Sequence, residues 1–435
     1  MTDTVQRYKD YLITSFVKAV QPVVIDSAEG CVVRDVSGRE YLDCFAGISV
    51  VNAGHCNPRV IAAARAQMEK LIHCGSYIYY SPATGALAEK MAQIMPWPEL
   101  RKTFFANSGA EAIEGALKAA RLFSGKHEII SLQASFHGRT WGTLSITGNQ
   151  ARKMRGGPYA PGVAFAPAPY TYRSAWPNDV KRCVDFWSQT LEEIIRFSTA
   201  GDVAAFIAEP VMGEGGIIVP PPDYFREIKK VLDKHGILFI CDEVQSGFGR
   251  TGKMFAIEHY GVEPDILVTA KGIADGFPLA AFTTRDEIAA SFRPGDHLST
   301  FGGNPVSCAA ALANIEYLQG ERLCEQTLEK GEYLRDRLRS LQDEFPLIGE
   351  VRGLGLMVGI ELVRDAELTP ATAEAEAVRE HCLGHGVLVG VGGIYGNVVR
   401  IQPPLVITRE QIDRAVEAVG YGIGMVQGSA TGGRR

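Results

Sequence analysis

Short, unbroken apolar runs alternate along the chain with longer segments of helical periodicity. Ala204–Ala208, Ile237–Cys241 and Ile266–Thr269 are almost entirely apolar and four or five residues long, which is typical of parallel strands buried on both faces. Ala110–Phe123 and Val180–Phe197 place apolar residues three and four positions apart, which predicts amphipathic helices. The alternation predicts an α/β fold with a mostly parallel central sheet flanked by helices.

The remaining pattern suggests how the chain is divided. Beyond residue 310, predicted helices alternate with strand-like runs, which we interpret as a smaller α/β domain. We expect residues 1–59 to form an N-terminal arm that joins this small domain, residues 60–310 to form the large domain, and residues 311–435 to complete the small one. Other predicted strands are Thr103–Ala106, Ile129–Leu132, Glu350–Ile360, Gly386–Val389 and Val398–Ile401, the other helices are Ile61–Met68, Ala86–Ile94 and Val306–Leu318, and Gly156–Asp179 is predicted to be irregular.

Three of the buried runs end in charged residues. Glu209 follows the first run, Asp242 the second, and Lys271 comes two positions after the third. Ligands bind at the carboxyl ends of strands in open parallel sheets. We therefore expect a carboxylate and an amine to share one small molecule at this edge.

A lysine at such a position is suited to covalent chemistry. Burial lowers the pKa of a lysine, and a neutral amine is a nucleophile that forms Schiff bases. Pyridoxal phosphate requires this kind of lysine and an anion beside its ring nitrogen, which makes Lys271 and Asp242 candidates for the two roles. An ordinary ion pair at the sheet edge is the alternative interpretation.

A second candidate element opens the helix at Ala110. Ser108-Gly-Ala-Glu111 has the spacing of a capping box, in which Ser108 accepts from the third helical N–H and Glu111 reaches back. Free N–H groups and the helix dipole make such a terminus a phosphate site, although many capped helices bind nothing. Phe136 and His137 follow another strand and are candidates to stack on a flat ring.

Composition narrows the function classes. The chain has 435 residues, 46% hydrophobic and 22% charged, with a net charge of −6. It has no basic cluster interleaved with aromatic residues, so no nucleic-acid partner is expected. No apolar run approaches about 18 residues, so no membrane association is expected. Nine cysteines without a Cys-x-x-Cys pair favour a reducing compartment, the cytoplasm.

Three other motifs compete with this interpretation. Gly247–Lys253 has the skeleton of a nucleotide-binding P-loop, but Met254 stands where a magnesium-binding hydroxyl is required. Gly353–Gly359 has one residue too many for a dinucleotide fingerprint. His381 and His385 lie four apart at a predicted helix end, where two solvated cations are favoured over a metal site. We expect no metal.

Six motifs occur in a characteristic order, and they cover much of the chain. With them the chain resembles the class III, pyridoxal-phosphate-dependent aminotransferases of fold type I, including 4-aminobutyrate, acetylornithine and ω-amine transaminases. The similarity extends from about residue 41 to about residue 405. The motifs are Ser108-Gly-Ala-Glu111, Phe136-His-Gly138, Ala208-Glu-Pro210, Cys241-Asp-Glu-Val-Gln245 with Gly247-Phe-Gly-Arg-Thr-Gly252, Ala270-Lys-Gly272 and Ser299-Thr-Phe-Gly-Gly-Asn304.

The resemblance implies a role for each cofactor-binding residue. It implies that Lys271 forms the Schiff base and moves the proton, and that Asp242 pairs with the ring nitrogen. It further implies that the ring lies between Phe136 and Val244. The other implied contacts are Gln245 at the ring hydroxyl, Ser108, Gly109 and Ala110 at the phosphate, His137 and Glu209 beside the cofactor, and Thr300 at the phosphate of a neighbouring subunit.

The resemblance also implies substrate contacts and partners. Arg400 matches a carboxylate-binding arginine, and Glu214 matches a glutamate that pairs with it and swings away, so that one site accepts an amine and an α-keto acid. Arg139 and Ile48 are further substrate candidates. A site built from two chains implies a homodimer or a dimer of dimers.

The predicted reaction is a ping-pong transamination. The amino group passes from an ω-amino compound or amine, such as 4-aminobutyrate, an ornithine-like diamine, a β-amino acid or a chiral amine, to an α-keto acid. Two alternatives on the same scaffold remain open, an amino-acid racemase or epimerase and a dialkylglycine-type decarboxylase. From other classes, a non-catalytic cofactor-binding homologue and a P-loop protein are the alternatives.

Overall fold

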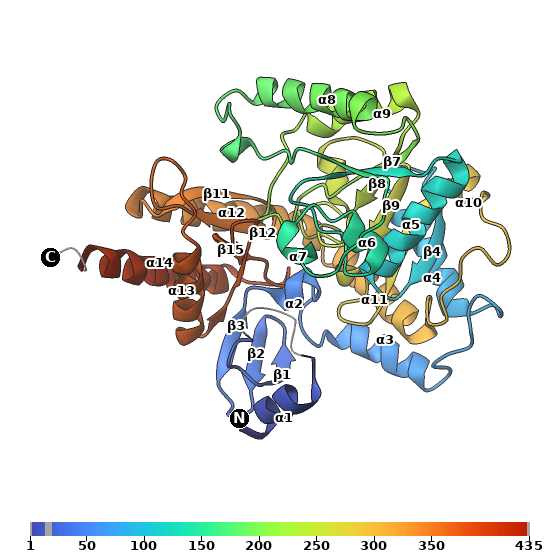
Figure 1. Ribbon diagram of the computed structural model, residues 1–435. Coiled ribbons are helices and arrows are strands. Elements are labelled where there is room, and N and C mark those ends of the chain that lie inside the picture. The colour runs from blue at the N-terminus through green and yellow to red at the C-terminus, as the bar shows by residue number, and fades with distance from the viewer. Residues whose placement is uncertain (1, 14–19, 433–435) are drawn as a thin grey trace.

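The computed structural model describes residues 2–13 and 20–432 and contains three sheets (Figure 1). The largest sheet has the strand order β4-β10-β9-β8-β7-β5-β6, and all its neighbouring pairs are parallel except those made by β10. The predicted α/β fold with a mostly parallel central sheet is confirmed. The strands are β4 (Lys102–Ala106), β5 (Glu128–Leu132), β6 (Val163–Ala166), β7 (Val203–Ala208), β8 (Leu238–Asp242), β9 (Ile266–Thr269) and β10 (Ala280–Thr284).

Helices cover both faces of this sheet. On β7, Phe206 packs in one core cluster with Trp187 of α8 (Val180–Phe197) and Phe225 of α9 (Tyr224–His235), while Ile207 packs in another with α5 (Gly109–Ser124). In Figure 1, α8 and α9 lie along one side and α5 on the other. This double burial explains why the central strands are continuous apolar runs.

Two four-stranded sheets are built from the chain ends. One has the order β1-β2-β3-β13 and joins the N-terminal arm to a C-terminal strand, and the other has the order β11-β12-β15-β14. Their positions in the sequence agree with a small domain drawn from both ends, although the boundaries at residues 59 and 310 stay a prediction. The strands are β1 (Ile25–Glu29), β2 (Val32–Asp35), β3 (Glu40–Asp43), β11 (Ile348–Leu354), β12 (Met357–Leu362), β13 (Val387–Leu388), β14 (Gly390–Gly392) and β15 (Val398–Ile401).

The remaining helices surround these sheets. The longer ones are α1 (Thr2–Tyr11), α3 (Pro58–Met68), α4 (Pro82–Ile94), α11 (Pro305–Gly320), α12 (Leu323–Glu344), α13 (Thr372–Gly384) and α14 (Arg409–Gly432). The short ones are α2 (Ala46–Ser49), α6 (Trp141–Ser145), α7 (Gln150–Lys153), α10 (Asp286–Ala289), η1 (Thr171–Arg173), η2 (Ala256–His259) and η3 (Lys271–Ile273). In the part of the chain that the structure describes, we find no helix with the length and apolarity that a bilayer span needs.

The structure corrects two local predictions. The run Glu350–Ile360 is not one strand, because β11 and β12 form an antiparallel hairpin that turns at Gly355, whose φ is 52°. Apolar residues continue through that turn, so the hydrophobic pattern gave no indication of it. The segment predicted to be irregular, 156–179, contains β6, which pairs in parallel with β5.

Candidate active site

Three charged residues of the predicted site lie at the ends of three adjacent strands. β8 lies between β7 and β9 in the large sheet, and it pairs in parallel with both. Glu209 directly follows β7, Asp242 ends β8, and Lys271 begins η3 just beyond β9. All three side chains line one cavity of about 330 Å³. The carboxylate and the amine therefore meet at one edge of the sheet, where the sequence places them.

Asp242 is held by contacts that orient its carboxylate. Its Oδ2 lies 2.7 Å from Nδ1 of His137, and its Oδ1 accepts a hydrogen bond of 3.0 Å from the Val244 N–H. The side chain is only 3% exposed. Nε2 of His137 is buried and has no hydrogen-bond partner among the described residues. A buried polar atom of this kind needs a partner, so its position beside the cavity suits a polar ligand.

Glu209 connects two loops of the site. Its Oε1 accepts from the Phe136 N–H at 3.0 Å, and its Oε2 accepts from the Gly213 N–H at 2.9 Å. Burial raises the pKa of Glu209 to about 7, with a further increase from Asp242, against the opposing effects of His137 and the two hydrogen bonds. Its carboxyl oxygens thus fix the backbone at Phe136, which lines the cavity, and at Gly213.

Lys271 occupies a strained turn. Its φ is 47°, in the left-handed region that non-glycine residues rarely adopt, and such strain is concentrated at functional sites. Burial lowers the pKa of Lys271, although the carboxylates of Glu214, Asp242 and Glu209 act in the opposite direction. A lower pKa increases the fraction of neutral amine, which is the nucleophilic form.

The N-terminus of α5 forms the other end of the cavity. Ser108 Oγ accepts from the Glu111 N–H at 3.2 Å, as predicted for the cap. Glu111 differs from the prediction, because its Oε2 accepts from the Asn107 N–H at 2.8 Å, one residue before the cap. A Cβ on Gly109 would lie 2.9 Å from the Val244 side chain, so a larger residue would press on this part of the cavity lining.

The cavity collects most of the predicted cofactor residues. Gln245 lines it, and its Oε1 accepts a 2.9 Å hydrogen bond from Gln402, a contact that the sequence did not indicate. Thr300 is exposed and does not line it, and Ile48 is 39% exposed and also lies outside. The predicted residues that line it are Ser108, Gly109, Ala110, Phe136, His137, Glu209, Glu214, Asp242, Val244, Gln245 and Lys271.

Two arginines flank Glu214, the cavity residue that the sequence pairs with Arg400. Glu214 Oε1 contacts Nη1 of Arg400 at 2.8 Å, and Glu214 Oε2 contacts Nη2 of Arg152 at 3.1 Å. Burial acts to raise the pKa of Glu214, but Arg400 first, then Lys271 and Arg152, lower it to about 2. The predicted pairing of Arg400 with Glu214 is present. Arg152 was missed, because nothing in the basic segment 150–155 distinguishes it before the fold is known.

Arg139 lies at the margin of this group. It is exposed, and its guanidinium carbon is 5.2 Å from the centroid of the Phe136 ring. It is not among the residues lining the cavity. Its role as a substrate contact stays a prediction.

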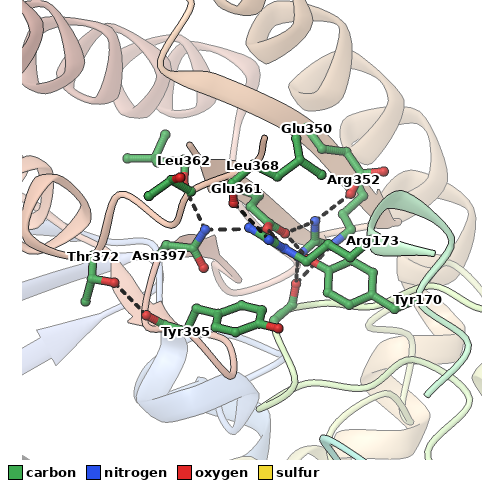
Figure 2. A network of polar contacts seen from close by, with 12 residues as sticks. Tyr170, Arg173, Glu350, Arg352, Glu361, Leu362, Leu368, Thr372, Tyr395 and Asn397 are labelled. Atoms are coloured by element: carbon green, nitrogen blue, oxygen red, sulfur yellow. Dashed lines mark hydrogen bonds and ion pairs between the residues drawn. The ribbon is translucent and has the colours of Figure 1, made fainter. Parts of the chain in front are cut away.

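A buried polar network fixes the loop that carries Glu214. Figure 2 shows Arg173 and Arg352 converging on Glu361. Nε of Arg173 donates to Glu361 Oε1 at 2.6 Å, and Nη1 of Arg352 donates to Glu361 Oε2 at 2.7 Å. Arg352 also donates through Nη2 to the Gly216 carbonyl at 2.6 Å and through Nε to the Ile217 carbonyl at 3.0 Å. The small sheet thus holds the backbone two and three residues beyond Glu214.

The competing motifs have structural uses. In Gly247–Lys253, a Cβ at Gly249 would lie 3.0 Å from Leu405 and one at Gly252 would lie 2.3 Å from Leu328, so these glycines permit close packing against C-terminal elements. Both His381 and His385 pack against the ring of Tyr421. Within residues 2–13 and 20–432, no three His, Cys, Asp or Glu side chains gather as a metal ion would need.

The residues fit pyridoxal phosphate. A capped helix N-terminus with free N–H groups faces one end of the cavity, Asp242 and Lys271 line it, and the unpartnered Nε2 of His137 lies buried beside it. The cavity volume of about 330 Å³ lies within the range of small-molecule sites.

Comparisons with known proteins agree with this fit. The sequence profile of the family described as Aminotransferase class-III matches residues 15–421. An acetylornithine aminotransferase of Methanothermobacter thermautotrophicus is 41% identical over 92% of this chain and 94% of that protein. A leucine/methionine racemase of Thermococcus litoralis is 39% identical over 99% of this chain and 97% of that protein. A thermostable (S)-enantioselective ω-transaminase from Thermomicrobium roseum superposes with a TM-score of 0.88 at 38% identity, covering 93% of each chain.

Proposed function

Because the chain belongs to the class III aminotransferases, we propose that it moves an amino group from an ω-amino compound or amine to an α-keto acid by a ping-pong mechanism. It is a pyridoxal-phosphate-dependent aminotransferase with the fold-type I architecture. The observation that carries the proposal is the meeting of Asp242 and Lys271 at adjacent strand ends around one cavity.

Each cofactor-facing residue has a chemical task in this proposal. Pyridoxal phosphate supplies the electron sink when it is bound. Lys271 supplies the nucleophilic amine and then carries the proton removed from the donor carbon, for which a lowered pKa is needed. Asp242, oriented by His137, keeps a negative charge at the ring nitrogen. Ser108 and the α5 N-terminus bind the phosphate.

The two substrates share one site through Glu214. Arg400 presents a fork of donors that suits a carboxylate, but Glu214 Oε1 occupies one of them at 2.8 Å. When this pair is closed, Glu214 balances the charge of Arg400, and the site accepts an amine donor without a nearby carboxylate. With the pair open, Arg400 binds the carboxylate of the α-keto acid. The names of the acetylornithine and ω-transaminase relatives support ω-amino donors.

We include a homodimer, or a dimer of dimers, in the proposal. Thr300 is exposed instead of lining its own cavity, which leaves it available to the phosphate site of a second subunit. Around it lies an apolar surface in which Ile72, Tyr79 and Phe301 are each about 60% exposed or more. The segment that carries Ile72 and the segment that carries Phe301 are adjacent, since Asn304 Nδ2 donates to the Ile72 carbonyl at 2.9 Å. Exposed apolar patches of this kind mark protein interfaces.

A cytoplasmic location completes the proposal. All nine cysteines are free thiols in the structure, and six of them are buried, as expected for small core residues in a reducing compartment. Measuring the distribution of the protein between cell fractions tests this part.

Racemisation is a second candidate, because a leucine/methionine racemase is 39% identical over 99% of this chain. Absorbance separates the two reactions. A transaminase given an amine alone loses its yellow absorbance band, since the amino group stays with the cofactor, whereas a racemase keeps that band.

The main experiment is a panel of amino donors against pyruvate and 2-oxoglutarate. We expect transamination by the wild-type enzyme and none by Lys271→Ala. Lys253→Ala is the matched control, because Lys253 is exposed and belongs to the glycine-rich turn, and we expect full activity from it. Retained activity in Lys271→Ala would contradict the mechanism.

A further inference from the structure

We propose that Arg152 is a specificity-determining positioning residue that retains Glu214 while a substrate carboxylate occupies Arg400. The inference rests on the proposed function and deepens it. It starts from the contacts of Glu214, whose two carboxylate oxygens bind two different arginines. Oε1 lies 2.8 Å from Nη1 of Arg400, and Oε2 lies 3.1 Å from Nη2 of Arg152.

Glu214 is a buried charge that cannot be left alone. Its side chain is 14% exposed, and its pKa of about 2 keeps it ionised at neutral pH. An ionised carboxylate that loses its only partner in such a site pays a large desolvation penalty. Opening the pair with Arg400 is therefore easy only if a second cation already holds the glutamate, and Arg152 is placed to do so.

The backbone next to Arg152 is anchored through Lys153. Arg152 lies on the short helix α7, whose next residue, Lys153, places its ammonium 4.5 Å from the centroid of the Phe165 ring. The Tyr159 hydroxyl donates to the Lys153 carbonyl at 2.6 Å. The Arg152 side chain is 34% exposed, but its Nε is buried without a partner among the described residues. The anchored backbone keeps Arg152 beside Glu214 when the pair between Glu214 and Arg400 opens.

The local charges support exchange over permanent pairing. Arg400 and Arg152 carry two positive charges against the single negative charge of Glu214. Arg139 interacts electrostatically with both Arg152 and Glu214. Nε of Arg400 is also buried without a partner among residues 2–13 and 20–432. Such an excess of donors accommodates an incoming carboxylate on Arg400 while Glu214 keeps Oε2 on Arg152.

The test measures carboxylate binding directly. The holoenzyme is titrated by calorimetry with glutarate, a dicarboxylate that cannot react because it has neither an amino group nor a keto group. We expect Arg152→Gln to weaken binding about tenfold, which is about 1.4 kcal/mol, because Glu214 then competes for Arg400 without an alternative partner. Arg152→Lys should recover part of the loss. Arg155→Gln is the matched control, since Arg155 is exposed on the same segment, and should change binding less than about twofold.

A double-mutant cycle isolates the route of the effect. In a Glu214→Gln background, Arg400 is free, so adding Arg152→Gln should have no further effect on glutarate binding. An equal effect in both backgrounds would overturn the proposal, because Arg152 would then act on the ligand and not through Glu214. Unchanged binding in Arg152→Gln alone would also overturn it.

Half-reactions supply a second readout. The rate with an amine that has no carboxylate, such as 1-phenylethylamine, should be unchanged in Arg152→Gln, whereas the apparent KM for pyruvate or 2-oxoglutarate should rise about tenfold with kcat retained. An equal loss in both half-reactions would indicate a structural role and contradict the inference. If the enzyme showed no transamination but still bound glutarate in an Arg152-dependent way, the proposed function would be overturned and this inference would stand. Failure of glutarate to bind the wild-type enzyme would overturn the inference itself.

Discussion

Two neighbouring acids at the end of β8 have opposite environments, and one of them gives a stability prediction. Asp242 faces the cavity, whereas Glu243 is fully buried behind it, where its Oε1 accepts from the Ile257 N–H at 2.8 Å and its Oε2 from the Ser246 hydroxyl at 2.5 Å. Burial raises the pKa of Glu243 from 4.5 to about 7, against these two hydrogen bonds. We predict that Glu243→Gln stabilises the protein above neutral pH.

The magnitude follows from linkage. Burial raises the pKa of Glu243 in the folded state, so the folded state binds the proton more tightly than the unfolded state does. The carboxyl therefore lowers the free energy of unfolding little below the unfolded pKa of 4.5 and most above about pH 7. The cost grows from about 1 kcal/mol at pH 5 to about 3 kcal/mol at pH 8. With an unfolding entropy of about 2.1 cal/mol/K per residue, 3 kcal/mol corresponds to about 3 °C in Tm for a chain of this size.

The assay compares melting curves of the cofactor-saturated enzyme at pH 5 and pH 8. Glutamine is nearly isosteric, and its carbonyl can still accept from the Ile257 N–H, so the variant loses the ionisable proton and little else. The gain in Tm of Glu243→Gln should be about 2 °C larger at pH 8 than at pH 5. Glu344→Gln, which makes the same change in charge at an exposed position, should show no such difference. A shift that is equal at both pH values would refute the reasoning.

Two further predictions concern the supports of the site. Arg352→Met should lower the free energy of unfolding by about 3–5 kcal/mol, because it removes one of the two guanidinium groups from the buried Glu361. Melting curves measure this loss of stability. A variant as stable as the wild type would show that the network contributes little. Ser108→Ala should weaken pyridoxal phosphate binding about tenfold in a titration of the apoenzyme, since it removes the cap hydroxyl at the start of α5. Ser108→Thr, which keeps the hydroxyl, is the control, and equal affinity in both variants would contradict the assignment.

The strand ends were predictable because burial on both faces leaves a simple signal. β7, β8 and β9 are continuous apolar runs, and parallel neighbours must present their carboxyl ends at one edge, so the meeting of Asp242 and Lys271 follows from the order of the strands. β10, Ala280–Thr284, was missed because its run follows the glycine-punctuated loop without a turn signal of its own and enters the sheet antiparallel. Register and direction depend on neighbours that periodicity does not reveal.

The charged residues around Glu214 were less predictable for a different reason. Arg400 and Glu214 were identified only through family resemblance, and Arg152 was not identified at all. The contact between Arg152 and Glu214 spans 62 residues and the one between Arg400 and Glu214 spans 186. No local pattern marks an arginine whose role depends on a partner so distant in sequence. The predicted reach of Glu111 failed on a smaller scale, because Asn107 supplies the N–H in place of Ser108.

The two sides of the site are built from different kinds of structure, and this difference bears on how substrates vary. Asp242 and Lys271 are placed by hydrogen-bonded neighbouring strands, so moving either would disturb the sheet. Glu214, Arg152 and Arg139 lie on loops or a four-residue helix, where side chains can be exchanged at little cost to the core. Relatives named as acetylornithine aminotransferase and as racemase share about two-fifths of their residues with this chain. We therefore predict that specificity is determined by the charges around Glu214, whereas the strand edge that carries Asp242 and Lys271 stays fixed.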